Sequence, residues 1–347
     1  MSALQEIWFL LLIVIVIIYV ILDGFDLGVG FWFIFAKDKH QETTLNERKE
    51  IIQSIAPFWD GNEVWLLAAG GILFAAFSDV YATVFSAFYV PLILVAFCLI
   101  IRAVSIEFRE EFPNPIWHKI SDIAFIFGSL GPAIAFGVLI GNLVQDIAIN
   151  ADKRFTGSFI DHFNPYSILI GLLALSMIIT HGAVYLRARA TDKLAAKATQ
   201  WAKMGIISFL AISSGSLVIS LIFHPHIIDN FLNMPILLII PLIGFVCILF
   251  TSYFIWNEKD AKLTFLLSSL SIAFSILGAG VAIYPNLVFS SLDEAYSLTI
   301  HNASATDAGL LVMLIVALIA LPLILVYTLW IYKMMGTKLK DEDITGY

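Results

Sequence analysis

Long apolar runs recur along the whole chain and are separated by short polar segments. A transmembrane helix needs about 20 mainly apolar residues to cross roughly 30 Å of hydrocarbon. The runs are continuous rather than alternating, which argues against a transmembrane β-barrel. The pattern therefore predicts one all-α membrane domain over residues 1–347, a bundle of nine transmembrane helices. The predicted spans are Ile7 to Phe35, Ile51 to Phe77, Val80 to Val104, Ile120 to Val144, Pro165 to Leu186, Ala202 to Phe223, Met234 to Trp256, Leu263 to Ile283 and Ala308 to Tyr332.

Composition supports an integral membrane protein. Hydrophobic residues make up 60% of the 347 residues and charged residues only 13%, against roughly 25% charged in soluble domains. The first run lacks a basic leader and is much longer than the apolar core of a signal peptide, so we expect it to remain in the mature protein. Cys98 and Cys247 lie in separate apolar runs, where small buried side chains are the expected reading. No disulfide framework or zinc site is predicted.

The basic residues predict the orientation, because Lys and Arg favour the cytoplasmic side of short loops. With the N-terminus outside and the C-terminus in the cytoplasm, only Lys153 and Arg154 of the 19 basic residues fall in outer loops. The residues assigned to the inner side are Lys37, Lys39, Arg48, Lys49, Arg102, Arg109, Lys119, Arg187, Arg189, Lys193, Lys197, Lys203, Lys259, Lys262, Lys333, Lys338 and Lys340.

Two outer loops are longer than the others. They run from Gln145 to Asn164 and from Tyr284 to Asp307, and they end in Asn-Pro and Thr-Asp pairs that are typical of helix starts. Neither loop is long enough to form a domain of its own.

Carboxylates interrupt the first two apolar runs. Asp23 and Asp26 lie in the first run, and Asp60 and Glu63 lie in the second. An ionised carboxylate in hydrocarbon is costly unless it is paired, hydrated or protonated, so these side chains must face a partner helix or a water-filled cavity. Each pair has the i, i+3 spacing of one helix face. The two helices run in opposite directions, which puts both pairs at similar depth, so the four carboxylates are expected to share one buried polar pocket.

Two readings of this pocket stay open. In the first, the carboxyl groups are protonated, hydrogen-bonded contacts that hold helices together. In the second, they are stations of a proton relay, which is the usual use of carboxylates inside membranes. Gly24, Gly28 and Gly30 in the first run would let another helix or water approach closely.

Glu107, at the cytoplasmic end of the third span, is a candidate mouth for such a relay. The alternative is an interfacial Glu paired with Arg102 or Arg109. Trp59 and Trp65 flank the carboxylates of the second span, where they could either pack against neighbours or donate hydrogen bonds through their ring N–H groups.

The histidines argue against haem binding by this chain. Only His181 of the seven lies inside a predicted span, and a bis-histidine haem needs two facing ligands. A lone histidine there is expected to be a hydrogen-bonded core residue. His224 and His226 flank Pro225 in an outer segment, and no metal site is predicted from them.

Three motifs, together with the nine spans, resemble subunit II of cytochrome bd-type quinol oxidases along essentially the whole chain. They are Asp23 to Gly30, Ala56 to Leu66 and Gly141 to Gln145.

The resemblance implies a multi-pass protein of the bacterial plasma membrane that pairs with a haem-bearing subunit I. That partner carries haem b and a haem d or second haem b, and the complex oxidises quinol, reduces oxygen to water and generates proton motive force. No catalytic residue, haem or metal site is implied on this chain. Membrane lipid is an expected partner, small single-span subunits stay open, and nucleic acid is not expected.

The same resemblance associates Asp26, Asp60 and Glu107 with proton delivery from the cytoplasm. Glu63 is a departure because some relatives have Gln there, and Glu107 replaces an Asp of some members. A quinone site on this chain, the quinol used and dimerisation of the complex stay open.

A proton-coupled secondary transporter is the alternative, since it would also need buried carboxylates. Such transporters usually show an internal repeat with interrupted helix pairs, and neither feature is found in this sequence.

Overall fold

The computed structural model describes residues 3–36 and 47–340. Lys37 and Lys39, which the sequence assigns to an inner loop, lie outside the described residues. Eight helices in the described part are long and apolar enough to cross a membrane: α1 (Ala3–Trp32, continued by η1, Phe33–Phe35), α5 (Tyr89–Phe108), α6 (Pro115–Gln145), α7 (Pro165–Arg189), α8 (Asp192–Phe223), α10 (Ile239–Trp256, preceded by η4, Pro235–Leu238), α11 (Ala261–Ile283) and α12 (Asp307–Met335).

The second predicted span is divided in the structure. Its first residues belong to α2 (Glu47–Ile55) and the rest forms α3 (Trp59–Ala76). α3 is not among the eight apolar helices, and it carries Asp60, Asn62 and Glu63 in its first two turns. The predicted third span is also divided, because α4 (Ser78–Ala87) ends at Ala87 and α5 begins at Tyr89, after the single residue Phe88. The remaining spans occur where they were predicted, with changed ends.

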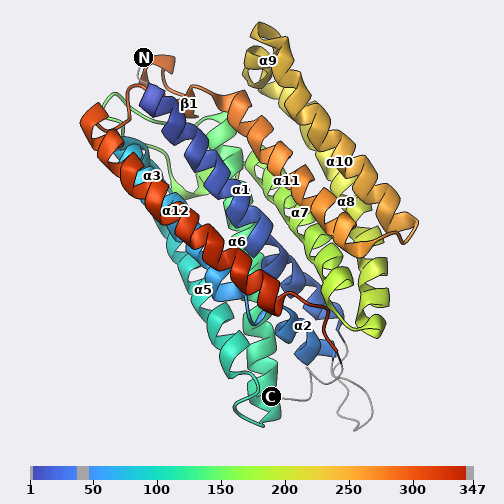
Figure 1. Cartoon of the computed structure of the whole chain (residues 1–347). Helices are drawn as coiled ribbons and strands as arrows, with labels where there is room; N and C mark the ends of the chain where they lie inside the picture. The colour runs from blue at the N-terminus through green and yellow to red at the C-terminus, as the bar shows by residue number, and fades with distance from the viewer. Residues whose placement is uncertain (1–2, 37–46, 341–347) are drawn as a thin grey trace.

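α1 and α7 form the interior of the bundle. α1 contacts α3, α6, α7, α11 and α12, and α7 contacts α6, α8 and α11 as well (Figure 1). Close approach to α7 and α6 requires the glycines of α1: a Cβ on Gly28 would lie 2.1 Å from the carbonyl oxygen of Ile178, and one on Gly30 would lie 2.2 Å from Oγ of Ser129. Gly24 has no such close neighbour.

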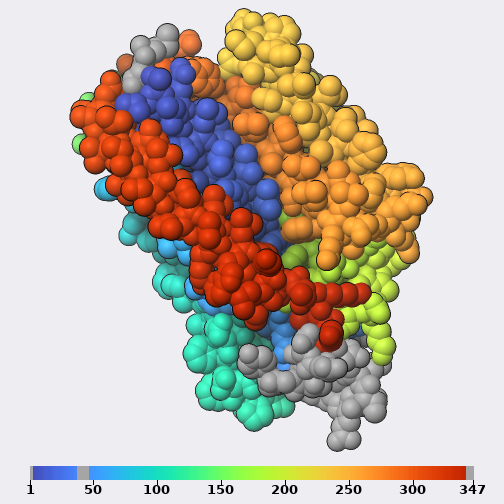
Figure 2. All heavy atoms as spheres, viewed as in Figure 1, coloured from blue at the N-terminus to red at the C-terminus, as the bar shows by residue number. Residues whose placement is uncertain are grey.

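α12 lies across the surface of the bundle and partly covers α1 (Figure 2). It is the most apolar of the spans, with a mean hydropathy of 3.1, yet only 6% of that stretch is buried. Its start lies beside the start of α1, because the ring N–H of Trp8 donates to the carbonyl of Leu310 at 3.0 Å. Its far end lies beside the end of α7, where the N–H of Leu339 donates to Arg189 at 2.8 Å. Near this end Tyr332 packs against Phe25, in the second half of α1, at a ring-centroid distance of 6.5 Å, so α1 and α12 run in parallel.

Asn-Pro and Thr-Asp pairs begin the helices that follow the long loops. The side chain of Asn164 accepts from the N–H of Ser167 before α7, and Thr306 accepts from the N–H of Gly309 before α12. Both helix starts were predicted from the sequence.

The all-α prediction is correct for the bundle, but the long loops add some β-structure. β1 (Asn286–Val288) and β2 (Leu298–Thr299) form a small antiparallel pair. A bridge from Ile147 to Ser290 ties the two long loops together, and a second bridge, from Ile149 to Phe155, lies within the first of them. Four further elements complete the loops at this end: η2 (Phe159–Phe163), η3 (Pro225–Ile228), α9 (Asp229–Asn233) and η5 (Glu294–Tyr296).

The apolar interior divides into two main clusters along α1. One contains the α1 residues from Trp8 to Tyr19 and packs against the long loops, and the other contains those from Phe25 to Phe33. Asp23 lies between them, so the polar residues of α1 occupy the level at which the two apolar clusters meet.

Candidate functional site

A buried arginine joins two of the predicted carboxylates. Arg102 lies in α5 with a fully buried side chain, and its Nη2 is 2.6 Å from Oδ1 of Asp23 and 3.3 Å from Oε1 of Glu63. Asp23 is also fully buried, whereas the side chain of Glu63 is 22% exposed. α1, α3 and α5 thus meet at one guanidinium group. The prediction that Arg102 belongs to an inner loop, or pairs with Glu107, is wrong.

Asp26 belongs to the same region through an amide. Its Oδ2 accepts a hydrogen bond from Nδ2 of Asn62 at 2.8 Å, and the Asn62 Nδ2 also reaches the carbonyl of Leu22 at 3.3 Å. The hydroxyl of Tyr332 donates to Oδ1 of Asn62 at 2.9 Å, which brings α12 to the site. These contacts confirm that Asp23 and Asp26 lie at the depth of the polar turn of α3.

Several buried polar atoms of this cluster lack a hydrogen-bond partner within residues 3–36 and 47–340. They are Oδ2 of Asp23, Oδ1 of Asp26, Nε and Nη1 of Arg102, and Oε1 of Glu63, which is ion-paired with Arg102 but not hydrogen-bonded to it. Buried polar groups are nearly always satisfied in proteins by other groups or by ordered water. The cluster of Asp23, Asp26, Asn62, Glu63 and Arg102 therefore has capacity for further hydrogen bonds.

Charge in this cluster is unbalanced. Three carboxyl groups face one guanidinium, so full ionisation would leave net negative charge in a buried site, where it is costly. Uptake of a proton by a carboxyl would relieve that cost. The chemistry available here is exchange of protons at oxygen atoms beside a fixed cation.

Asp60 does not share this pocket, contrary to the prediction of four clustered carboxylates. It lies one residue into α3 and is exposed on the surface of the chain. Successive residues point in different directions around a helix. Asn62 and Trp65 lie on the buried face of α3, and Asp60 lies on another face. Glu107 is exposed as well, near the end of α5, and its Oε1 accepts a hydrogen bond from Nε1 of Trp59 at 3.1 Å.

The expected arginine partners of Glu107 are engaged elsewhere. Arg109 donates to Oδ1 of Asp122 at 2.7 Å and also contacts Glu110. Trp59 is thus a hydrogen-bond donor, whereas Trp65 is buried and its ring N–H has no partner in the part of the chain described.

His181 is a hydrogen-bonded core residue, as predicted. Its Nε2 lies 3.1 Å from the carbonyl of Ile21 and its Nδ1 lies 2.8 Å from Oγ of Ser268. A carbonyl only accepts, so Nε2 carries the proton and Ser268 donates to Nδ1.

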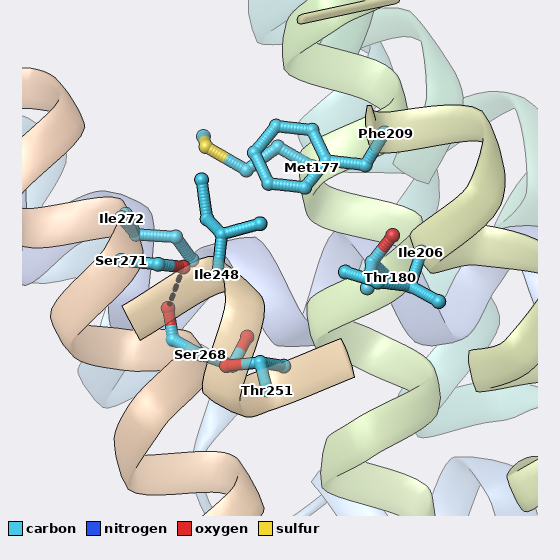
Figure 3. A pocket seen from close by; sticks show the side chains of 9 residues that line it. All are labelled: Met177, Thr180, Ile206, Phe209, Ile248, Thr251, Ser268, Ser271 and Ile272. Carbon is cyan, nitrogen blue, oxygen red and sulfur yellow. Dashed lines mark hydrogen bonds between the residues drawn. The ribbon is translucent and has the colours of Figure 1, made fainter. Parts of the chain in front are cut away.

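A very small cavity adjoins Ser268 between α7, α8, α10 and α11 (Figure 3). Its volume is about 10 Å³, enough for about one water molecule. Its lining includes Thr180, Thr251 and Ser271, and Ser271 donates to the carbonyl of Ser268 at 2.7 Å.

Sequence reasoning missed Arg102, Asn62 and Tyr332 as members of the polar cluster. Arg102 could have been found because it lies inside the apolar run of its span and because buried carboxylates need a cation. Asn62 lies between two acidic residues that were singled out. No sequence signal distinguishes Tyr332 from other aromatic residues near helix ends.

Comparison with known proteins gives one consistent result. The model of the family described as cytochrome bd terminal oxidase subunit II matches residues 4–335. The chain is 37% identical to the cytochrome bd-I ubiquinol oxidase subunit 2 of Escherichia coli K12, covering 99% of this chain and 97% of that protein. It is 32% identical to the cytochrome bd ubiquinol oxidase subunit 2 of Bacillus subtilis 168, covering all of both chains.

A solved structure shares the fold. A chain of the bd oxidase from Geobacillus thermodenitrificans superposes with a TM-score of 0.75 over 97% of this chain and all of that one, at 17% identity.

Proposed function

The chain belongs to the cytochrome bd terminal oxidase subunit II family, and on this basis we propose that it docks against a haem-bearing subunit I and helps to deliver cytoplasmic protons to it. Membership makes the chain a multi-pass protein of the bacterial plasma membrane and a subunit of a quinol:oxygen oxidoreductase complex. The haem b and haem d, or second haem b, lie on subunit I in this proposal, and quinol is the substrate of the complex.

The observation that carries the proton-delivery proposal is the buried cluster around Arg102. Reduction of oxygen consumes protons at a buried haem, so relay groups must connect that haem with the cytoplasmic surface. Asp23, Asp26 and Glu63 supply carboxyl oxygens at one depth, and Arg102 is hydrogen-bonded to Asp23 and forms a looser ion pair with Glu63. The atoms of this cluster that lack protein partners favour bound water, which would connect the carboxyl groups.

Exposed carboxylates on an apolar face support docking of a partner. Asp60 continues a stripe of exposed side chains on α3 that includes Leu67 and Phe74, which are 74% and 61% exposed. Glu107 ends a similar stripe on α5 that includes Phe97. An ionised carboxylate that faces lipid is costly. If subunit I covers Asp60 and Glu107, these two carboxylates can pass protons from the cluster to the partner.

The proposed topology has nine crossings, with the N-terminus outside and the C-terminus in the cytoplasm. α3, with α2 before it, supplies the ninth crossing beside the eight apolar helices. The parallel course of α1 and α12 supports this arrangement, because two helices at the beginning and end of a bundle run in the same direction only with an odd number of crossings.

Topology can be tested with a reporter enzyme that is active only outside the cytoplasm. We expect activity when it is fused after Asn230, in α9, and none when it is fused after Lys340, beyond α12. The reverse pattern would contradict the proposed orientation, and activity at both sites would contradict the three crossings by α10, α11 and α12 that separate Asn230 from Lys340.

Purification tests the proposed function. We expect the tagged chain to bring down a haem-containing partner, and this complex to consume oxygen when quinol is added. Expressed without that partner, the chain is expected to bind no stoichiometric haem, because His181 uses both ring nitrogens for hydrogen bonds. An absorbance spectrum measures both results. Stoichiometric haem b on the isolated chain would refute the haem-free assignment.

A further inference from the structure

Tyr332 links α12 to the buried polar cluster. α12 is otherwise poorly covered, and Leu310, at the opposite end, is the one residue of this helix that is buried. The ring of Tyr332 is stacked on that of Phe58, with the centroids 4.4 Å apart, and meets the ring of Phe25 edge-on at 6.5 Å. These two ring contacts hold the hydroxyl of Tyr332 beside Asn62.

The chain beyond Tyr332 is anchored as well. Leu339 is buried, and its N–H donates to the carbonyl of Arg189 at 2.8 Å. The guanidinium of Arg189 in turn lies over the ring of Phe58, 5.6 Å from the centroid. The end of α12 is therefore fixed both to the end of α7 and to the residue that precedes α3.

The direction of each hydrogen bond at Asn62 follows from the groups that face it. The carbonyl of Leu22, 3.3 Å away, can only accept, so the atom of Asn62 that faces it is the amide nitrogen. The amide oxygen therefore faces Tyr332, whose hydroxyl donates to it at 2.9 Å. The amide nitrogen also donates to Oδ2 of Asp26 at 2.8 Å. A directed chain of hydrogen bonds thus runs from Tyr332 through Asn62 to Asp26.

Asn62 makes the two carboxyl oxygens of Asp26 unequal. Oδ2 accepts the N–H of the amide, whereas Oδ1 has no hydrogen-bond partner within the described ranges of the chain. A proton can therefore be taken up and released at Oδ1 while Oδ2 stays bound to Asn62. Hydrogen bonds in a chain polarise one another, so donation by Tyr332 strengthens the bond from Asn62 to Asp26.

We propose that Tyr332 is a positioning residue for proton transfer at Asp26 and that it acts through Asn62. This inference rests on the proton delivery proposed above. Without the hydroxyl of Tyr332, the amide oxygen of Asn62 loses its donor in a buried site, which is costly, so the amide would turn towards another donor. The carboxyl of Asp26 would then lose the bond that fixes its orientation, and a displaced group transfers a proton more slowly.

Tyr332→Phe tests the inference, because it removes the hydroxyl and keeps the ring that packs on Phe58. Oxygen uptake by the assembled complex is measured over a range of quinol concentrations. We expect kcat to fall by about tenfold, the upper end of what one hydrogen bond contributes, with the KM for quinol and the haem spectrum unchanged. Since proton transfer is the step that slows, the ratio of kcat in water to kcat in heavy water should be larger than in the wild type.

Tyr327→Phe is the matched control. It is the same substitution on the same helix, but Tyr327 is exposed and lies outside the cluster. We expect kcat, KM and the isotope ratio of this variant to equal those of the wild type.

A double-mutant cycle shows whether Tyr332 acts through Asn62. Asn62→Ala should lower kcat at least as much as Tyr332→Phe does, and adding Tyr332→Phe to it should cause no further loss. Equal losses from Tyr332→Phe in both backgrounds overturn the proposal. Should Asn62→Ala not assemble, kcat and the isotope ratio of Tyr332→Phe decide by themselves.

Three results with Tyr332→Phe alone also overturn the proposal. They are the kcat of the wild type, a lower kcat with the isotope ratio of the wild type, and failure of the complex to assemble. The last two would make the hydroxyl of Tyr332 a structural contact only.

Asp26→Asn separates this inference from the proposed function. If Asp26→Asn loses turnover while Tyr332→Phe keeps it, only the positioning role of Tyr332 fails. If an assembled Asp26→Asn complex keeps full turnover, proton transfer at Asp26 is rejected, and the positioning role is rejected with it.

Discussion

Arg102→Met is expected to destabilise the chain strongly and to reduce the yield of assembled complex. The guanidinium of Arg102 is the cation that contacts Asp23 and Glu63, and its removal leaves a fully buried Asp23 without its charged partner. Removing one member of a buried ion pair typically costs about 3–5 kcal/mol. Thermal unfolding of the purified complex, together with the amount of subunit II in the membrane, measures the effect.

A second substitution separates charge from packing. Replacing a whole buried ion pair by neutral groups of similar size is often nearly neutral for stability, so Asp23→Asn combined with Arg102→Met should recover much of the stability lost by Arg102→Met alone. Glu63→Gln serves as the control, because Glu63 is partly exposed and lies farther from Arg102 than Asp23 does. We expect it to change stability little. A double variant as unstable as Arg102→Met would show that packing of the arginine side chain, and not its charge, stabilises this site.

The positions of the membrane helices were largely predictable, because the length and hydrophobicity of an apolar run can be read from that segment alone. Hydropathy alone does not show where a run breaks internally. α4 ends at Ala87 within an apolar stretch, and the signal that was overlooked is Pro91 in the first turn of α5, which has no backbone N–H to continue the helical hydrogen bonding. α8 begins at Asp192, ten residues before the predicted span, because its first turns are polar helix that a hydropathy argument does not detect.

The candidate site was predicted in part. The first two helices run in opposite directions, and comparing residues at equal depth predicted Asp23 and Asp26 beside the polar turn of α3. The hydrogen bond from Asn62 to Asp26 confirms this prediction. The direction in which each side chain points around its helix could not be predicted with the same accuracy. One residue of a helix turns by about 100°, so Asn62 faces α1 while Asp60 faces outward. Arg102 was assigned to an inner loop because the preference of Lys and Arg for the cytoplasmic side was applied to every basic residue near the end of a predicted span.

Asp60→Asn is expected to assemble with all haems and to lose most quinol oxidase turnover, by about tenfold or more. Asp60 lies between the buried cluster and the face proposed for subunit I, on the same turn of α3 as Glu63 and next to Trp59, which holds Glu107. A carboxyl group at this junction can pass a proton from one side to the other, and a positioned group in proton transfer contributes about a hundredfold or more to a rate. Asn keeps the size and the hydrogen bonding of Asp but cannot titrate. Oxygen uptake with excess quinol and the haem absorbance spectrum of the same sample give turnover and assembly.

The controls for Asp60→Asn distinguish a relay from a structural contact. Asp152→Asn, in the outer loop and exposed, should leave turnover unchanged. Asp60→Glu keeps the titrating group with a longer side chain, so it should retain much more activity than Asp60→Asn if proton transfer is the function of this residue. Full oxygen uptake by an assembled Asp60→Asn complex would reject the relay. The complex could also fail to assemble with Asp60→Asn and yet assemble with Asp60→Glu. That result would assign the Asp60 carboxylate to the contact with subunit I, because docking, and not proton transfer, would then require its negative charge.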